Sequence, residues 1–268
     1  MKEFKKSRRN FINKAIAVGG VGIVAPSLIF SAKGNSIGVT DEQKYQRPKV
    51  LFFDVNETLL DLNAMKKSIG NALGGRPDLV SLWFTTMLQY SLVTTVGNQY
   101  HDFGKIGGAA LKMVGLNNGV VITDEQAGEA IKPILSLPAH PEVKEALILL
   151  KKEEYTLVSF TNSSNKAVES QLKNAGIYDL FDDRLSIEDV GKFKPHYDAY
   201  NWAARKMGFE SKDCMLIAAH GWDVAGANWA GWQTAFVSRP GQQLFTLANS
   251  PEINEKDLLL IAKQLVKL

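Results

Sequence analysis

The stretch FFDVNETLLD, residues 52–61, decides the fold of this 268-residue chain. It runs from apolar residues into the carboxylate of Asp54, then through a short polar cluster, and back to apolar residues. A continuous apolar run of this kind is typical of a parallel strand buried on both faces. Asp54 would then follow the carboxyl end of that strand, where open α/β sheets bind ligands. The stretch alone leaves three roles open for Asp54: turn residue, metal ligand or nucleophile.

Further apolar runs follow the first one, VLFFDV, at 50–55. They are TLVSF (156–160), the weaker RLSI (184–187), MLIAA (215–219) and TAFVS (234–238). Helical patterns separate the later runs, at Asn165–Ala175, Tyr197–Met207 and Asp223–Ala230. This alternation predicts an α/β fold, a doubly wound, Rossmann-like parallel sheet with right-handed crossovers.

A long segment between the first two predicted strands has helical spacing throughout. Pro77 is placed to begin a helix. The apolar stripe of that helix is predicted to be Leu79, Leu82, Trp83, Met87 and Tyr90. Further helices are predicted near 105–114, 124–135 and 141–152. Since a crossover needs only one helix, we expect an inserted helical cap domain at 63–141, and a core domain formed by 49–62 and 142–268.

The first 32 residues resemble an export signal rather than part of the fold. Paired arginines, Arg8 and Arg9, precede the apolar run AIAVGGVGIVAPSLIFSA, as in twin-arginine signals that export folded proteins. Cleavage near Ala32 would leave a periplasmic or otherwise exported protein without stable membrane association, and residues 33–48 would be a linker. An uncleaved membrane anchor is the alternative, although the run is short for a span and contains Pro26.

Charge and cysteine content exclude some classes of protein. The formal charge is +3, of which the first 32 residues contribute +5, leaving −2 for the rest. That balance does not suggest a nucleic-acid partner. The single cysteine, Cys214, rules out an internal disulfide framework and most thiolate metal sites.

Polar residues follow each main predicted strand, and the sheet would bring them to one crevice. Ordinary helix capping and turn chemistry could explain any one of these loops, but not all four together. The residues are Asp54, Asn56 and Thr58 after the first strand, Thr161, Asn162, Ser163 and Ser164 after the second, Lys192 and Lys194 after the third, and His220, Trp222 and Asp223 after the fourth.

The order of these loops resembles the haloacid dehalogenase superfamily, and within it the hydrolytic type II L-2-haloacid dehalogenases. The resemblance covers Lys49 to about Arg239. It rests on FDVNETLLD, SFTNSS, KFKP and AAHGWDVAGA, which match the four motifs of that superfamily in order. It implies an enzyme that acts on carbon–halide bonds of a small-molecule haloacid without a cofactor or metal. A homodimer is compatible with the resemblance.

The resemblance also assigns roles. Asp54 matches the nucleophile, Thr58 the residue that steadies it, and Lys194 the lysine that pairs with it. An ammonium group a few ångströms away would keep Asp54 ionised. We expect Thr58 and Asn162 to donate to Asp54 and so fix which oxygen attacks.

The other matching positions concern substrate and water. Thr161 and Asn162 stand where the family holds the carboxylate group, and free N–H groups at the following helix start would suit that anion. Tyr200 matches a tyrosine six residues after the lysine. Asp223 matches the last acid, which we expect to activate the hydrolytic water, itself or through a neighbour.

A phosphatase of the same superfamily is the main alternative. Such enzymes place a second aspartate two residues after the nucleophile, where this chain has Asn56, which cannot donate and retrieve a proton at neutral pH. A further magnesium-binding acid is replaced by Ala219, which leaves too few carboxylates for a hard cation.

Some positions depart from the dehalogenase pattern, which leaves open a binding protein that has lost its chemistry. Phe84 replaces a cap arginine near the leaving halide, although it could equally be cap core, and Ala218 and His220 replace a serine and an asparagine. We expect a rebuilt halide cradle, formed by Phe84, Asn56, Trp222 and His220. His220 could be structural, but its place before Asp223 suggests that it positions or deprotonates the hydrolytic water.

Overall fold

The sheet of the core has six parallel strands in the order β3-β2-β1-β4-β5-β6. The computed structural model describes residues 45–268, so the predicted export signal lies outside the described residues. The strands are β1 (Val50–Phe53), β2 (Thr156–Thr161), β3 (Asp183–Ser186), β4 (Cys214–Ala218), β5 (Gln233–Val237) and β6 (Ile253–Glu255). Five of them lie where the apolar runs predict strands. The edge strand β6 was not predicted, because its three residues are too few to show a pattern.

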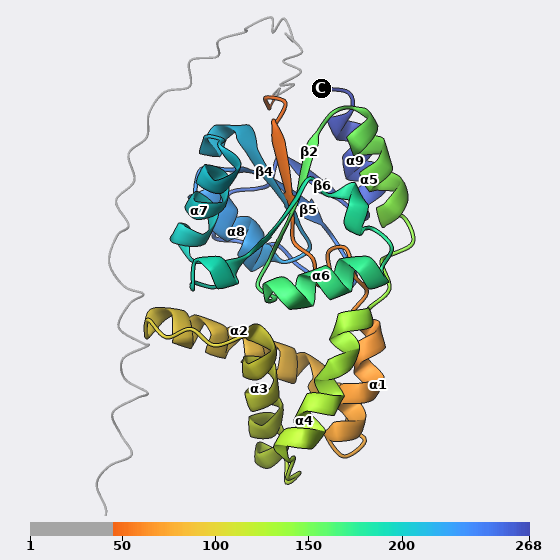
Figure 1. Cartoon of the computed structure of the whole chain (residues 1–268), viewed down its shortest axis with the longest axis vertical. Helices are drawn as coiled ribbons and strands as arrows, with labels where there is room; N and C mark the ends of the chain where they lie inside the picture. Colours follow the sequence, from red (N-terminus) through yellow and green to blue (C-terminus); the bar gives the residue numbers. More distant parts are fainter. Residues whose placement is uncertain (1–44) are drawn as a thin grey trace, which may run out of the picture. The chain divides into compact units, whose positions relative to one another are not determined.

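Helices cover both faces of this sheet (Figure 1). On one face lie α7 (Tyr197–Met207) and α8 (Gly221–Trp229), which contact each other. On the other face α5 (Val143–Lys152) packs against α9 (Leu258–Leu265). The predicted doubly wound Rossmann-like fold is therefore confirmed.

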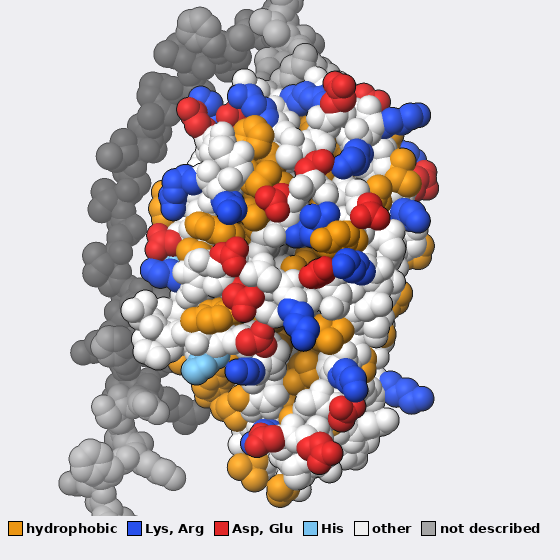
Figure 2. Space-filling view, in the orientation of Figure 1, with side chains coloured by type: hydrophobic (Ala, Val, Ile, Leu, Met, Phe, Trp, Pro, Cys, Tyr) orange, Lys and Arg blue, Asp and Glu red, His pale blue; other side chains and the backbone are white. Residues whose placement is uncertain are grey.

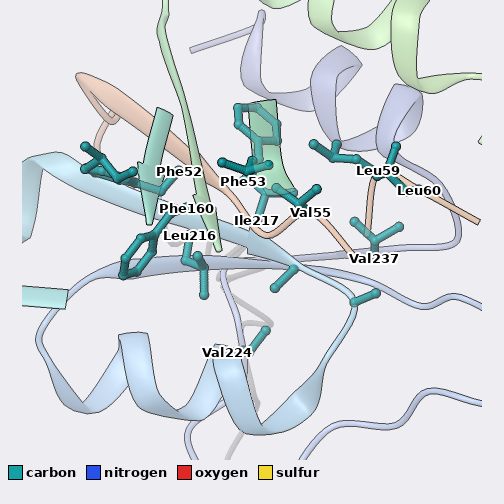
Figure 3. Packing of buried hydrophobic residues seen from close by; sticks show 14 of the residues in the cluster. Phe52, Phe53, Val55, Leu59, Leu60, Phe160, Leu216, Ile217, Val224 and Val237 are labelled. Atoms are coloured by element: carbon teal, nitrogen blue, oxygen red, sulfur yellow. The ribbon is translucent and has the colours of Figure 1, made fainter. Parts of the chain in front are cut away.

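The strand β1 lies in the interior of the sheet. All four of its residues are fully buried, between β2 on one side and β4 on the other. Figure 3 shows Phe52, Phe160 and Leu216 close together in this core. Each fully buried side chain of this size contributes roughly 2–3 kcal/mol. The strand therefore fixes where Asp54, the next residue, emerges.

Between β1 and α5 the chain forms the cap, which lies at the carboxyl ends of the strands (Figure 1). Its elements are α1 (Asn63–Ala72), η2 (Pro77–Leu79), α2 (Val80–Val96), α3 (Phe103–Asn117), α4 (Asp124–Ile131) and η3 (Lys132–Ser136). The helix α1 was not predicted, because its polar sequence buries only Met65, Ile69 and Gly70. The helix predicted near 124–135 is in fact α4 followed by the 3₁₀ turn η3.

The predicted apolar stripe of α2 is partly wrong. Trp83 and Met87 are buried, but Leu82 and Tyr90 are 49% and 36% exposed. The buried line continues instead through Ser91 and Thr95, at intervals of four residues. Each hydroxyl donates to a backbone carbonyl of its own helix, so burying it leaves no unsatisfied donor.

Charged side chains of both signs are interspersed over the face of the molecule in Figure 2. One described helical segment, Pro77–Val96, is long and apolar enough to cross a membrane by length and composition alone. In this fold it comprises η2 and α2, and α2 packs against α3 as part of the cap.

Candidate active site

Asp54 accepts hydrogen bonds on both carboxylate oxygens. The ammonium group of Lys194 lies 3.1 Å from Oδ1. The Thr58 hydroxyl donates to Oδ2 over 2.7 Å, and Nδ1 of His220 lies 3.2 Å from the same oxygen. Burial alone would raise the pKa of Asp54, but Lys194, His220 and Thr58 together lower it well below the usual range. Asp54 is therefore a carboxylate at neutral pH although only 5% of it is exposed.

Lys194 lies between two carboxylates. Its Nζ is 2.5 Å from Oδ2 of Asp223 and also donates to the carbonyl of Phe160 over 2.9 Å. Burial would lower the pKa of Lys194, but Asp223 and Asp54 raise it above its ordinary value. The ammonium group therefore stays charged in a fully buried position.

Asn162 has a different task from the one predicted. Its Oδ1 accepts the backbone N–H of Lys194 over 3.0 Å, and its Nδ2 donates to the carbonyl of the same residue over 3.4 Å. The expectation that Asn162 donates to Asp54 is wrong, because both ends of its amide hold the lysine loop. Asn162 thus positions the cation and does not choose the attacking oxygen.

Asp223 is fully buried, and both of its oxygens are occupied. Tyr200 donates its hydroxyl to Oδ1 over 2.6 Å, and Lys194 holds Oδ2. Burial raises the pKa of Tyr200 well above its ordinary value, so the phenol stays protonated. The predicted roles of Asp223 toward water and of Tyr200 toward substrate stay predictions, and the contacts show that the two side chains bind each other and Lys194. Together they fix Lys194.

His220 contacts Asp54 on the side away from Oδ1 and also contacts Glu57. Its Nε2 lies 2.9 Å from Oε2 of Glu57, so the ring bridges two carboxylates. Burial would lower the pKa of His220, but its hydrogen bonds to Asp54 and Glu57 raise it to about 9. The ring of Phe84, from the cap, stacks on the His220 ring with 6.0 Å between the ring centroids. The Trp222 ring also stacks on His220, with 5.2 Å between the centroids. The structure thus brings together three residues of the predicted halide cradle: Phe84, His220 and Trp222.

Asn56, the fourth residue of that predicted cradle, is engaged elsewhere. Its Nδ2 donates to Oγ of Ser163 over 3.1 Å, and its Oδ1 accepts from Gln171 over 2.8 Å. Thr161 accepts the backbone N–H of Ser163 over 3.1 Å, which shapes the turn after β2. In the structure Asn56 joins the loop after β1 to Ser163 and Gln171, and Thr161 supports the turn after β2; their predicted substrate contacts stay predictions.

The start of α6 (Asn165–Asn174) also differs from expectation. The backbone N–H of Asn165 donates to Glu188 over 2.8 Å, and its side chain donates to Asp189 over 2.7 Å. One of the backbone N–H groups that were expected to be free for a substrate carboxylate, that of Asn165, is therefore occupied.

Comparison with known proteins agrees with this geometry. The family model for haloacid dehalogenase-like hydrolases matches residues 48–231. The chain belongs to the haloacid dehalogenase-like hydrolase family. Similar proteins include the (S)-2-haloacid dehalogenases of Pseudomonas sp. (strain YL) and Pseudomonas fluorescens, which are 25% and 27% identical over 205 and 188 residues. The matches cover 76% and 70% of this chain, and 88% and 83% of those proteins.

A solved structure shares the fold of this haloacid dehalogenase-like hydrolase. The L-2-haloacid dehalogenase of Xanthobacter autotrophicus superposes with a TM-score of 0.75 at 22% identity. The match covers 81% of this chain and 97% of that one. At 22% identity, this likeness shows that the two proteins share the fold, which includes the cap.

The site of this haloacid dehalogenase-like hydrolase does not fit a divalent cation. Within residues 45–268 no group of three or more His, Cys, Asp or Glu side chains could hold a metal ion. The two strand-end acids, Asp54 and Asp223, are joined by the ammonium group of Lys194. A cation between them would have to displace that buried group.

Two residues that hold the site were not predicted. Glu57 pairs with His220, and Arg239 donates to the backbone carbonyl of Thr58 over 2.9 Å while it pairs with Glu142 at 2.7 Å. Glu57 could have been suspected, because it lies between Asp54 and Thr58 in the first motif. No signal in the sequence connects Arg239 to the first loop.

A cavity of about 1050 Å³ lies between the cap and the core. Its walls come from α3, α4 and η3 of the cap and from the first turns of α6. Phe103, Met113 and Ile131 are among its apolar side chains, and Lys105 and Lys166 reach it from opposite sides. Ser163 and Ser164 of the loop after β2 line this cavity, whereas Asp54, Lys194 and His220 do not.

Proposed function

We propose that this chain hydrolyses short 2-haloacids to 2-hydroxy acids without a cofactor, with Asp54 as nucleophile. The observation that carries the proposal is the ionised, buried Asp54 carboxylate, held by Lys194, Thr58 and His220. The named activity of the two Pseudomonas relatives supports it, since the matches span most of their length.

In the first step, an Asp54 oxygen attacks the carbon that bears the halogen. A carbon–oxygen bond forms, the carbon–halogen bond breaks, and the halide leaves with the bonding electrons. A carboxylate is a weak nucleophile in water, so desolvation and fixed orientation are what the site supplies. Lys194 and Thr58 hold Asp54 in one orientation.

In the second step, water attacks Cγ of Asp54 and the bond to the substrate oxygen breaks. The 2-hydroxy acid leaves and the carboxylate returns. Because the water oxygen stays on Asp54, turnover in oxygen-18 water should label that carboxylate. Tryptic peptides that contain Asp54, measured by mass spectrometry after several turnovers, test this step. Label in the product only, and never in the Asp54 peptide, would contradict the covalent route.

The phosphatase alternative lacks the second acid of its usual motif. Asn56 stands at the position of the second acid, and its amide is bound to Ser163 and Gln171. A neutral amide cannot give and retake a proton at pH 7.

Halide release from bromoacetate and L-2-chloropropionate, with and without EDTA, separates the hypotheses. We expect release that EDTA does not affect. Phosphate release from an aryl phosphate that depends on Mg²⁺ would instead identify a phosphohydrolase. Silence in both assays would identify a non-catalytic homologue.

We also propose that residues 1–32 act as a twin-arginine-type export signal, which places the enzyme outside the cytoplasm. The paired Arg8 and Arg9 before an apolar run support this. A reporter that folds before export should reach the periplasm when fused to residues 1–44, and should stay in the cytoplasm with Arg8→Lys and Arg9→Lys. Equal export of both fusions would contradict the proposal.

A further inference from the structure

The cavity between the cap and the core is larger than a short 2-haloacid needs. Its volume is about 1050 Å³. Pockets that hold drug-sized ligands have volumes of about 300–1000 Å³. A haloacid such as bromoacetate, with a single carbon beside its carboxylate, would fill only a small part of this space. The cavity therefore has room for a much longer molecule.

The wall of the cavity suits a molecule with one apolar end and one anionic end. Its buried residues are mostly apolar, and Met87, Phe103 and Ile131 are at most 8% exposed. Its exposed residues include Lys105 and Lys166, which form no salt bridge within residues 45–268. The apolar part of a ligand would therefore lie deep in the cavity, and ammonium groups would attract an anion that enters from the solvent.

The buried end of the cavity adjoins the catalytic loops, although Asp54 does not line it. Ser163 lines the cavity, and its Oγ accepts a hydrogen bond over 3.1 Å from Asn56, two residues after Asp54. Met87 lines the cavity one helical turn after Phe84, the cap residue whose ring reaches the catalytic groups. The loop after β1 and the helix α2 thus both lead from the catalytic groups to the cavity.

A further wall residue connects the cavity to the lysine loop. Phe103 lines the cavity, and its ring packs against that of Phe193 with 5.6 Å between the ring centroids. Phe193 directly precedes Lys194, whose ammonium group lies 3.1 Å from Oδ1 of Asp54. The cavity therefore begins beside the residues that surround the nucleophile.

We propose that this cavity holds the carbon chain of the substrate, and that the enzyme prefers long-chain 2-haloacids, of the length of 2-bromohexanoate to 2-bromodecanoate. With the halogen-bearing carbon at Asp54, the chain runs past Ser163 and Met87 into the cavity. This inference rests on the proposed function, because the reaction at Asp54 is what places the chain there. It extends that function from the shortest haloacids to acids with an apolar tail.

The chain should act through binding and not through the chemical step. Each methylene group that leaves water favours binding by about threefold to fourfold. A contact that is equally strong in the bound substrate and in the transition state lowers KM and leaves kcat unchanged. We therefore expect kcat/KM to rise with chain length while kcat stays nearly constant.

Two glycines in the wall allow the cavity to be filled by mutation. Gly108 of α3 and Gly128 of α4 line it. A methyl group added at Gly128 would meet no neighbouring side chain within 4 Å, and one at Gly108 would meet Ile131 and Ala127, at 3.6 and 3.9 Å. A leucine at either position would occupy space that the proposal assigns to the substrate chain. Glu125→Leu adds a leucine to α4 outside the cavity and is the matched control.

The test measures halide release by the full enzyme from 2-bromopropionate, 2-bromohexanoate and 2-bromodecanoate, which all react at a secondary carbon. In the wild type, kcat/KM should rise about 30-fold from 2-bromopropionate to 2-bromohexanoate. In Gly108→Leu and Gly128→Leu, the ratio of kcat/KM for 2-bromodecanoate to that for 2-bromopropionate should fall about tenfold. Glu125→Leu should keep the wild-type ratio in about 0.2 M salt, which screens the exposed charge that this control removes.

Decanoate, which has the chain and the carboxylate but no halogen, gives a second readout. It should inhibit the wild type competitively against 2-bromohexanoate, and should inhibit Gly108→Leu about tenfold more weakly. A chain-length series that is flat or falls in the wild type, noncompetitive inhibition by decanoate, or an unchanged ratio in both leucine variants would overturn the proposal and leave the proposed function standing. If none of the haloacids releases halide, the proposed function itself fails, and this inference with it.

Discussion

At the end of β1 both oxygens of Asp54 accept hydrogen bonds, and Lys194 and Asp223 beside it are fully buried. The cleft between cap and core is different, because its walls include apolar helix faces and lysines on both sides. The cap sends one aromatic side chain, Phe84, against the catalytic groups. In the proposed reaction the strand-end loops of the core supply the charged groups, and we expect the cap to affect substrate binding more than chemistry.

Removing the nucleophile should have the largest effect. Asp54→Asn should lower halide release by roughly 10⁴-fold or more, as for other covalent catalysts that lose their nucleophile. Steady-state halide release measures this, with circular dichroism as a check on folding. Asp61→Asn, seven residues later at the start of α1, is the control and should keep its activity. If the Asp54→Asn protein is as active as the wild type, Asp54 is not the nucleophile, and the reaction does not depend on this loop of the core.

Lys194→Met should affect both rate and stability. Turnover should fall on the order of 10³-fold, because removing one fixed charged donor from such a site costs about that much. The free energy of unfolding should fall by about 3–5 kcal/mol, since Asp54 and Asp223 are left buried without their cation. Urea unfolding at pH 7 gives the second value.

A second substitution checks the cause of that loss. If unpaired charge destabilises the Lys194→Met protein, adding Asp223→Asn should recover part of the stability while activity stays low. A further fall on adding Asp223→Asn would show that packing, and not charge, explains the loss.

The core loops were predictable because one local rule applies to each of them. A buried parallel strand ends at a ligand edge, so Asp54, Thr58, Lys194 and His220 could be placed in one crevice from their positions alone. Their partners could not be predicted in the same way. Whether Asn162 holds Asp54 or the lysine loop depends on distances of a few ångströms across two crossovers.

The cap was less predictable, for a physical reason. The helix α2 is apolar on most sides, so its sequence gives no single buried face, and the structure buries Ser91 and Thr95 while Leu82 is exposed. Glu57 was missed because its contact with His220 depends on a turn with a positive φ at Glu57, which no residue pattern predicts.

The pH dependence of stability tests the charge of His220. Its pKa is raised to about 9 from an ordinary value of 6.5, so its contribution to stability is complete below pH 6.5 and is lost as the pH rises through 9. The shift corresponds to about 3 kcal/mol, counted once for the ion pair with Asp54. Urea unfolding at pH 6 and pH 10 should show this loss in the wild type.

The matched variant is His220→Gln, which has no charge to lose. Its stability should fall by about 3 kcal/mol less than that of the wild type between the two pH values. Parallel curves for the two proteins would mean that His220 is neutral in the folded enzyme.

Phe84→Ala tests the aromatic contact between the cap and His220. Without the Phe84 ring, the interaction that holds the His220 ring in place should weaken by about 1 kcal/mol. The kcat for bromoacetate should then fall by roughly fivefold to tenfold. Leu82→Ala, on the same helix but exposed, should change kcat little. A loss as large as that of Lys194→Met would show that the cap takes part in the chemistry directly.

The smallest effect is expected at the lysines of the cleft. Lys112 and Lys132 pair with Asp124 and Glu129, whereas Lys105 and Lys166 form no salt bridge within residues 45–268. If these two attract the anionic substrate, Lys105→Gln with Lys166→Gln should lower kcat/KM about threefold at low ionic strength and leave kcat unchanged. The difference should vanish in about 0.5 M salt, which screens exposed charges, and Lys112→Gln should have a smaller effect. A change in kcat that survives high salt would instead assign the cleft to the chemical step, and the division between core and cap would no longer hold.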